Sequence, residues 1–183
     1  MKFVQKEFNT TLEVKKSKFI TYICPYDNFK TLLVRLKKEH PKAKHFVYAY
    51  RYLNEFDQIV ENSSDDGEPK GTSGRPSLNV LNGASIINTA IITIRYFGGI
   101  KLGTGGLVKA YSDTVNLVCS NSDFIMYEKL EEYNLEVTYT KLSKVEYQLN
   151  EIGIKIIKKE FSEKVNLVLE TTNEKLSKLK VIL

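Results

Sequence analysis

Nine of the ten glycines fall between Gly67 and Gly106, and eight of these lie in two clusters, DDGEPKGTSGRP at 65–76 and RYFGGIKLGTGG at 95–106. Glycine costs conformational entropy in a fold, so a cluster indicates backbone that needs a positive φ or lies close to another group. The second cluster follows the apolar run AIITI at 90–94 and precedes an apolar-periodic stretch, which predicts a strand-to-helix connection. Such connections direct backbone N–H groups at an anion over the helix start. The alternative is two tight turns without a ligand.

Positive charge is expected to converge on this helix start. Thr104 is placed to cap the helix, and the glycines after it leave the first-turn amides uncovered. The helix dipole adds about half a positive charge there. The pattern is neither a Walker GK[ST] loop nor a GxGxxG dinucleotide fingerprint. We therefore predict a cradle for a phosphate or an RNA backbone, formed by Arg95, Lys101, Gly103, Thr104, Gly105, Gly106 and Lys109.

The first glycine cluster lies in an acidic loop. Its carboxylates lack the Dx[DN]xDG spacing of a calcium loop, so we expect no metal. Instead we expect them to hold the loop by accepting hydrogen bonds from backbone amides or from basic groups such as Arg75, Arg95 or Lys101. The residues predicted to support the cradle are His45, Asp65, Asp66, Gly67, Glu68, Gly71, Thr72 and Arg75.

Catalytic chemistry has little support in the sequence. His45 is the only histidine inside a predicted strand, where it has either a structural role or a place near the glycine loops. No Ser/His/Asp or Cys/His arrangement accompanies it, so we predict no catalytic residue. Cys24 and Cys119 are isolated, which predicts neither zinc nor a disulfide and fits a reducing cytoplasm. No cofactor is expected.

The charge distribution favours a polyanionic partner. Residues 1–51 contain 12 Lys and Arg against four Asp and Glu, whereas residues 52–68 carry six carboxylates and no base. A basic stretch suits RNA, although a lysine-rich surface explains much of it too. No apolar run approaches the roughly 20 residues of a membrane span, and the charged N-terminal segment does not resemble an export signal. A cytoplasmic protein without a membrane partner is therefore expected.

The elements that must position these residues follow from the apolar patterns. HFVYAYRY at 45–52 alternates as a strand does, and Phe56–Val60 is its expected hairpin partner, followed by a long polar loop at 61–76. Asp27 is predicted to cap a helix whose apolar stripe is Phe29, Leu32, Leu33 and Leu36. The other expected elements are two strands within 10–24, a helix opened by Pro76, a central strand at 90–97 and a helix from Thr104.

The remainder has a pattern of its own. Strand, helix, strand, strand and helix are predicted at 135–140, 142–152, 154–161, 165–171 and 173–179. This βαββα order is a split βαβ unit that lacks its last strand, since Val181–Leu183 is too short to supply one. We place a boundary near 127–130, which gives an N-terminal domain at 1–128 and a C-terminal domain at 129–183.

Four segments together resemble the YigZ/IMPACT family: KSKFI at 16–20, PKAKHFVYA at 41–49, DDGEPKGTSGRP at 65–76 and RYFGGIKLGTGGLVKAY at 95–111. The resemblance covers essentially the whole chain and is strongest over 1–127. It implies an α+β protein whose two-layer α/β first domain resembles a small ribosomal-subunit protein and the fourth domain of the translocation elongation factor. A ferredoxin-like second domain follows in bacterial members. The chain departs from the family at Ser77–Leu78 and at its end.

The resemblance also implies a role in translation. Eukaryotic members are similar to regulators that damp the stress pathway acting on an initiation factor, and bacterial members are described as nucleic-acid or ribosome binders. We therefore favour a non-enzymatic regulatory protein that binds RNA, the ribosome or another phosphate-containing ligand, with a translation factor or regulatory protein as a further partner. The alternatives are an enzyme acting on a phosphorylated small molecule or nucleotide, and a protein-interaction module. The sequence does not indicate an oligomeric state.

Overall fold

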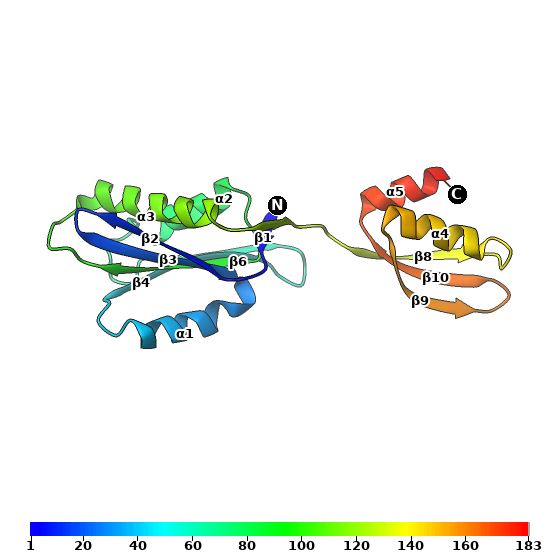
Figure 1. Cartoon of the computed structure of the whole chain (residues 1–183), viewed down its shortest axis with the longest axis horizontal. Coiled ribbons are helices and arrows are strands. Elements are labelled where there is room, and N and C mark those ends of the chain that lie inside the picture. Colours follow the sequence, from blue (N-terminus) through cyan, green and yellow to red (C-terminus); the bar gives the residue numbers. More distant parts are fainter. Residues whose placement is uncertain (183) are drawn as a thin grey trace. The chain divides into compact units, whose positions relative to one another are not determined.

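The computed structural model describes residues 1–182 and divides into two compact units, one from Met1 to Tyr127 and one that begins at Glu128 (Figure 1). Each unit has its own sheet and its own apolar core. Among the described residues, no helix combines the length and apolar character that a membrane crossing requires.

A five-stranded sheet forms the centre of the first unit. Its order is β2 (Phe8–Val14), β3 (Ser17–Pro25), β6 (Thr89–Tyr96), β4 (His45–Leu53) and β5 (Ile59–Ser64), and neighbouring strands are antiparallel. The central strand β6 is buried over nearly its whole length, as its continuous apolar run predicts. A short ladder of β1 (Lys2–Val4) and β7 (Phe124–Met126) lies outside this sheet.

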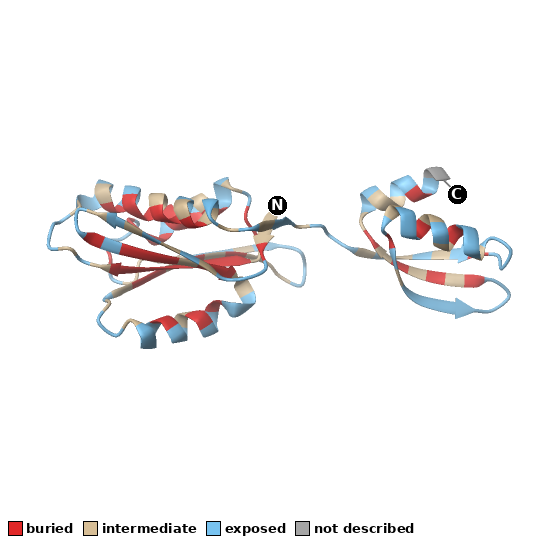
Figure 2. Ribbon diagram, in the orientation of Figure 1, coloured by how far each residue is buried: buried red, intermediate tan, exposed pale blue. Residues whose placement is uncertain are grey.

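Helices cover both faces of the sheet. Helix α1 (Phe29–Glu39) packs on one face, and α2 (Gly74–Gly83) and α3 (Gly103–Ser120) pack on the other (Figures 1 and 2). The expected two-layer arrangement is therefore wrong, because the first unit has three layers. The reason is that β6 has buried residues on both faces, so each face needs a cover: Ile92 and Ile94 pack with α1, and Ile91 packs with α2 and α3.

Several local predictions need correction. Asp27 lies in a 3-10 turn, η1 (Tyr26–Asn28), and among the described residues no side chain caps α1. Strand β5 takes up residues expected in the polar loop, because an edge strand needs few apolar side chains. Helix α2 begins two residues before Pro76. Thr104 is no cap, since α3 begins at Gly103 and its N-cap is Leu102.

The second unit has the predicted order of elements: β8 (Glu131–Val137), α4 (Leu142–Ile152), β9 (Lys155–Phe161), β10 (Val165–Thr171) and α5 (Asn173–Ile182). The three strands pair antiparallel in the order β8-β10-β9, and both helices share one core with the sheet. Within residues 1–182 the sheet has no fourth strand. Of the segment judged too short for one, Val181 and Ile182 end α5, and Leu183 lies outside the described residues.

Replacing Gly98 with alanine is expected to destabilise the first unit. A Cβ atom there would clash with the backbone carbonyl group of Lys16, and backbone cannot move aside cheaply. We expect a loss of about 1–3 kcal/mol in the free energy of unfolding, measured by urea denaturation. Gly83→Ala is the control, because no atom of the described residues lies within 4 Å of a Cβ there. Equal stability of the Gly98 variant and the parent protein would contradict the prediction.

Candidate functional site

Strand register brings three connections to one end of the first sheet. The last residues of β6 lie opposite the first residues of both neighbours, since Tyr96 pairs with Lys18 and Arg95 pairs with His45. The β2–β3 turn, the segment before β4 and the segment 97–102 after β6 therefore meet there. The amide of Gly98 donates to Ser17 Oγ at 3.2 Å, which ties two of these connections together.

A buried ion pair forms the floor of this region. Arg95 Nη1 donates to both carboxylate oxygens of Glu68, at 2.7 and 2.9 Å, and the two side chains are only 8% and 3% exposed. Tyr111 on α3 donates its hydroxyl to Glu68 Oε1 at 2.9 Å. Burial, followed by the neighbouring carboxylate, raises the pKa of Tyr111 far above its usual value, so the hydroxyl keeps its proton. The acidic loop, β6 and α3 are thus joined at one point.

Asp65 closes the acidic loop onto the start of α2. One carboxylate oxygen accepts the amides of Ser73 and Gly74 and the Ser73 hydroxyl, and the other accepts the Gly71 amide at 2.7 Å. Burial favours a higher pKa for the Asp65 carboxyl, but these hydrogen bonds outweigh it and the pKa lies below its ordinary value of 3.8. Within the same loop, Thr72 donates its hydroxyl to the carbonyl of Pro69 at 2.7 Å.

Asp66 holds the loop against the start of β4. Its carboxylate accepts the Phe46 amide at 2.6 Å, and its carbonyl oxygen lies 2.8 Å from His45 Nδ1. A carbonyl only accepts, so Nδ1 carries the proton and Nε2 is an acceptor when the ring is neutral. Gly67 has a φ of +85°, and a Cβ there would lie 3.4 Å from His45 Nδ1. The prediction that the acidic loop is held by backbone amides and by Arg95 is confirmed.

A cavity of about 440 Å³ lies above the ion pair. Apolar side chains supply much of its wall, and lysines, His45 and the start of α3 supply its polar groups. The guanidinium carbon of Arg95 lies 5.6 Å from the ring centroid of Phe19 and 5.7 Å from that of Phe97. The lining residues are Lys44, His45, Glu68, Pro69, Arg95, Phe97, Lys101, Leu102, Gly103, Thr104 and Leu107.

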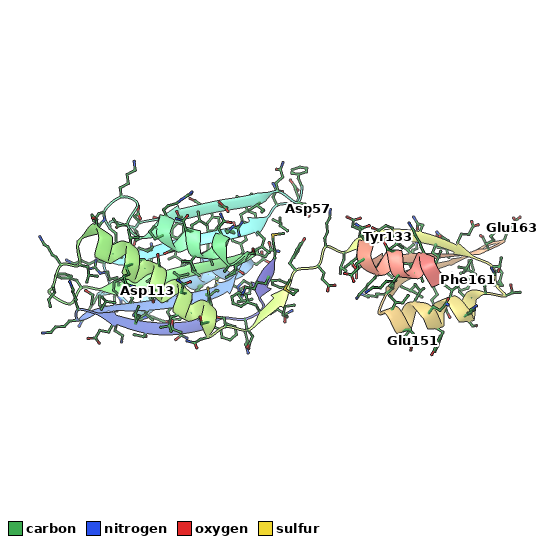
Figure 3. All side chains as sticks on the ribbon, turned by 90° about the horizontal axis from the view of Figure 1, so that it is seen from above. Asp57, Asp113, Tyr133, Glu151, Phe161 and Glu163 are labelled. Carbon is green, nitrogen blue, oxygen red and sulfur yellow. The ribbon has the colours of Figure 1, made fainter. Side chains whose placement is uncertain are left out.

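The predicted sources of positive charge are not all available at this cavity. Arg95 is neutralised by Glu68, and Lys109 pairs with Asp113 at 2.8 Å on the exposed side of α3, where Figure 3 labels Asp113. Lys101 lines the cavity and is exposed. Because α3 begins at Gly103, Gly106 is the first residue with a helical acceptor for its N–H, the carbonyl of Leu102. The uncovered amides are those of Gly103, Thr104 and Gly105.

Some predicted residues lie away from the cavity, and some residues that line it were not predicted from the sequence. Arg75 is exposed on α2 and does not line the cavity, and Gly71 is a turn residue with a φ of +76°. Lys44, Phe97 and the apolar wall were not predicted. The motif PKAKH at 41–45 and the aromatic residue inside RYFGG were their signals in the sequence. No group of three His, Cys, Asp or Glu within residues 1–182 is placed to hold a metal ion.

Comparisons with known proteins agree on one family. Residues 15–119 match the family model described as the Impact N-terminal domain. An IMPACT family member of Haemophilus influenzae is 32% identical over 86% of this chain and 78% of its own length. The IMPACT family member YigZ of Escherichia coli is 38% identical over 81% of this chain and 74% of its own. A crystal structure of a hypothetical protein matches 97% of this chain and 88% of its own, with a TM-score of 0.68 and 32% identity.

Replacing Glu68 with glutamine is expected to destabilise the first unit strongly. The Arg95 charge would stay buried without a counter-charge, which costs about 3–5 kcal/mol. Urea denaturation measures the loss. Asp113→Asn is the matched control, because it breaks an exposed ion pair of a kind whose loss costs about 0.5 kcal/mol or less. If both variants unfolded at the same urea concentration, the buried pair would not be an anchor.

Replacing Asp65 with asparagine should give a pH-dependent loss of stability. The folded-state pKa of Asp65 is lowered, so its contribution is present above the ordinary carboxyl pKa and is lost as pH falls through the folded-state value. At pH 7 we expect the variant to be less stable by about 1–2 kcal/mol, the usual cost of losing a helix cap. The difference should shrink below pH 4 or so. Asp123→Asn, at an exposed ion pair, should show no such trend.

Proposed function

Because the chain belongs to the IMPACT family, we propose that it is a non-enzymatic, translation-associated regulatory protein that binds RNA, free or within the ribosome. The binding surface in this proposal is the cavity at the start of α3 together with the lysines around it. The observation that carries it is the convergence of Lys44 and Lys101 with Gly103 and Thr104, two α3 residues whose amides are uncovered, on one cavity.

The electrostatics of this end favour a phosphate backbone. Lys44 and Lys101 come from two different connections, and both are exposed and form no ion pair within residues 1–182. Lys15 and Lys16 form the β2–β3 turn beside them and are also exposed. The amides of Gly103, Thr104 and Gly105 carry the positive end of the α3 dipole. Exposed lysines and free amides are the groups that contact phosphate oxygens.

The titratable side chains of the cavity support binding more than catalysis. Glu68 is occupied by Arg95 and Tyr111, and His45 Nδ1 is occupied by the Asp66 carbonyl. A general base must be free to reach a proton of the substrate. Glu68 is therefore poorly placed for that role, and within residues 1–182 His45 has no carboxylate partner to orient it for nucleophile activation.

We also propose the finer fold relationships. The order β8-β10-β9 with two helices on one face is what a ferredoxin-like unit would have without its last strand. In the first unit, β5 and β6 lie on either side of β4 and are joined through α2, which is a split βαβ connection. That connection supports a relationship to the ribosomal-protein and elongation-factor type of domain.

The double variant Lys44→Ala/Lys101→Ala should weaken RNA binding at low salt. Each lysine that contacts a phosphate releases counterions from single-stranded RNA, so the slope of log K against log salt should become shallower by about 0.7 per lysine. Fluorescence anisotropy with a single-stranded oligouridylate over a salt series measures this. The fold should survive, because both side chains are exposed.

Lys109→Ala is the control, since Asp113 already pairs with this lysine and it lies outside the cavity. Its slope should stay close to that of the parent protein. An unchanged slope in the double variant would reject the proposed surface. Saturable binding of a free nucleotide with a flat salt response would favour the phosphorylated-small-molecule enzyme, and binding of neither ligand would favour the protein-interaction module.

A further inference from the structure

We infer that the cavity at the start of α3 receives one unstacked nucleobase of a single-stranded RNA, while the phosphate next to it lies on the α3 amides. The inference rests on the proposed function. It adds the group that this surface recognises, which is an unstacked base. A duplex, whose bases are paired and stacked, would reach only the lysines at the rim.

The cavity wall suits an aromatic ring. Pro69, Leu102 and Leu107 line it together with Phe97, and its volume of about 440 Å³ lies within the range of small-ligand sites. Phe97 is 58% exposed although it is a large aromatic residue at the opening of a strand-to-helix connection. The bases of single-stranded nucleic acids stack on exposed aromatic rings that lie in basic surroundings.

Arg95, one of the residues that line the cavity, carries a buried donor that has no partner among the described residues. The Arg95 side chain is more than nine-tenths buried, and its Nε has no hydrogen-bond partner within residues 1–182. An unsatisfied buried donor is costly and rare. Arg95 lines the cavity beside His45, whose Nε2 is an acceptor when the ring is neutral. Arg95 and His45 thus bring a donor group and an acceptor group to the lining of one cavity, which is the mix found along the edge of a base.

The rim of the cavity supplies the groups that would bind the phosphate of the same nucleotide. Lys44, Lys101 and the amides of Gly103 and Thr104 bound the same cavity as Phe97. An apolar ligand without charge would leave these groups unused, and an inorganic phosphate would leave the apolar wall unused. A nucleotide within a flexible strand uses both, because it joins an aromatic ring to an anion.

The variant Phe97→Leu tests the inference. It keeps the charge and most of the apolar volume but removes the stacking surface. We expect its affinity for an oligouridylate of about 12 nucleotides to fall about tenfold, as loss of one base–aromatic stack predicts, with the salt slope unchanged. Its affinity for a duplex RNA of the same length should not change. Phe56→Leu, at a 72% exposed phenylalanine in the β4–β5 turn, is the matched control and should bind like the parent protein.

A backbone-only probe separates this inference from the proposed function. The parent protein should bind an abasic ribose-phosphate oligomer of equal length about tenfold more weakly than the oligouridylate. Equal affinity for the two probes, or unchanged affinity in Phe97→Leu, would overturn the base pocket while RNA binding through Lys44 and Lys101 remained. Absence of binding to every RNA probe would overturn the proposed function itself.

Discussion

The buried pair of Glu68 and Arg95 is the interaction on which the candidate site depends. It joins the acidic loop to the central strand β6, and Tyr111 extends it to α3. Two charges taken out of water are costly unless each meets its counter-charge and further hydrogen bonds. Here the carboxylate accepts from the guanidinium and from a hydroxyl, so the loop cannot leave without stranding a charge in the interior. The position of the loop therefore fixes the floor of the cavity.

The same pair decides where positive potential can arise. Because Glu68 neutralises Arg95, a strand arginine beside a glycine-rich turn adds little attraction for an anion. The potential must come from the α3 start and from exposed lysines on the connections. Those connections can lie so close together because Gly98 has no Cβ to clash with the backbone of Lys16, and Gly103 adopts a φ of +74°. The glycine clusters thus allow two backbone segments to lie close together, and they also leave the start of α3 open.

Local signals predicted much of this arrangement. The apolar run of β6, the alternation of β4 and the order of elements in the second unit follow from patterns that neighbouring residues set. The anchoring of the acidic loop followed from carboxylates surrounded by turn residues. Distant contacts were not predictable in the same way. The sequence did not predict the third layer, the place of Lys44 at the cavity, or the position of Lys109 outside it. These features depend on strand register and on the exact start of α3, and composition determines neither.

A surface built in this way separates affinity from selectivity. Exposed lysines act over roughly a Debye length and attract any phosphate backbone, so they contribute affinity that salt weakens. The cavity wall acts only on contact and contributes little until a ring enters, so its share is largely independent of salt. The buried ion pair contacts no ligand in this scheme, yet it is the reason that the lysines and the cavity wall occur at one place. It holds the rigid floor, and the flexible lysine side chains can move around it without loss of the cavity's shape.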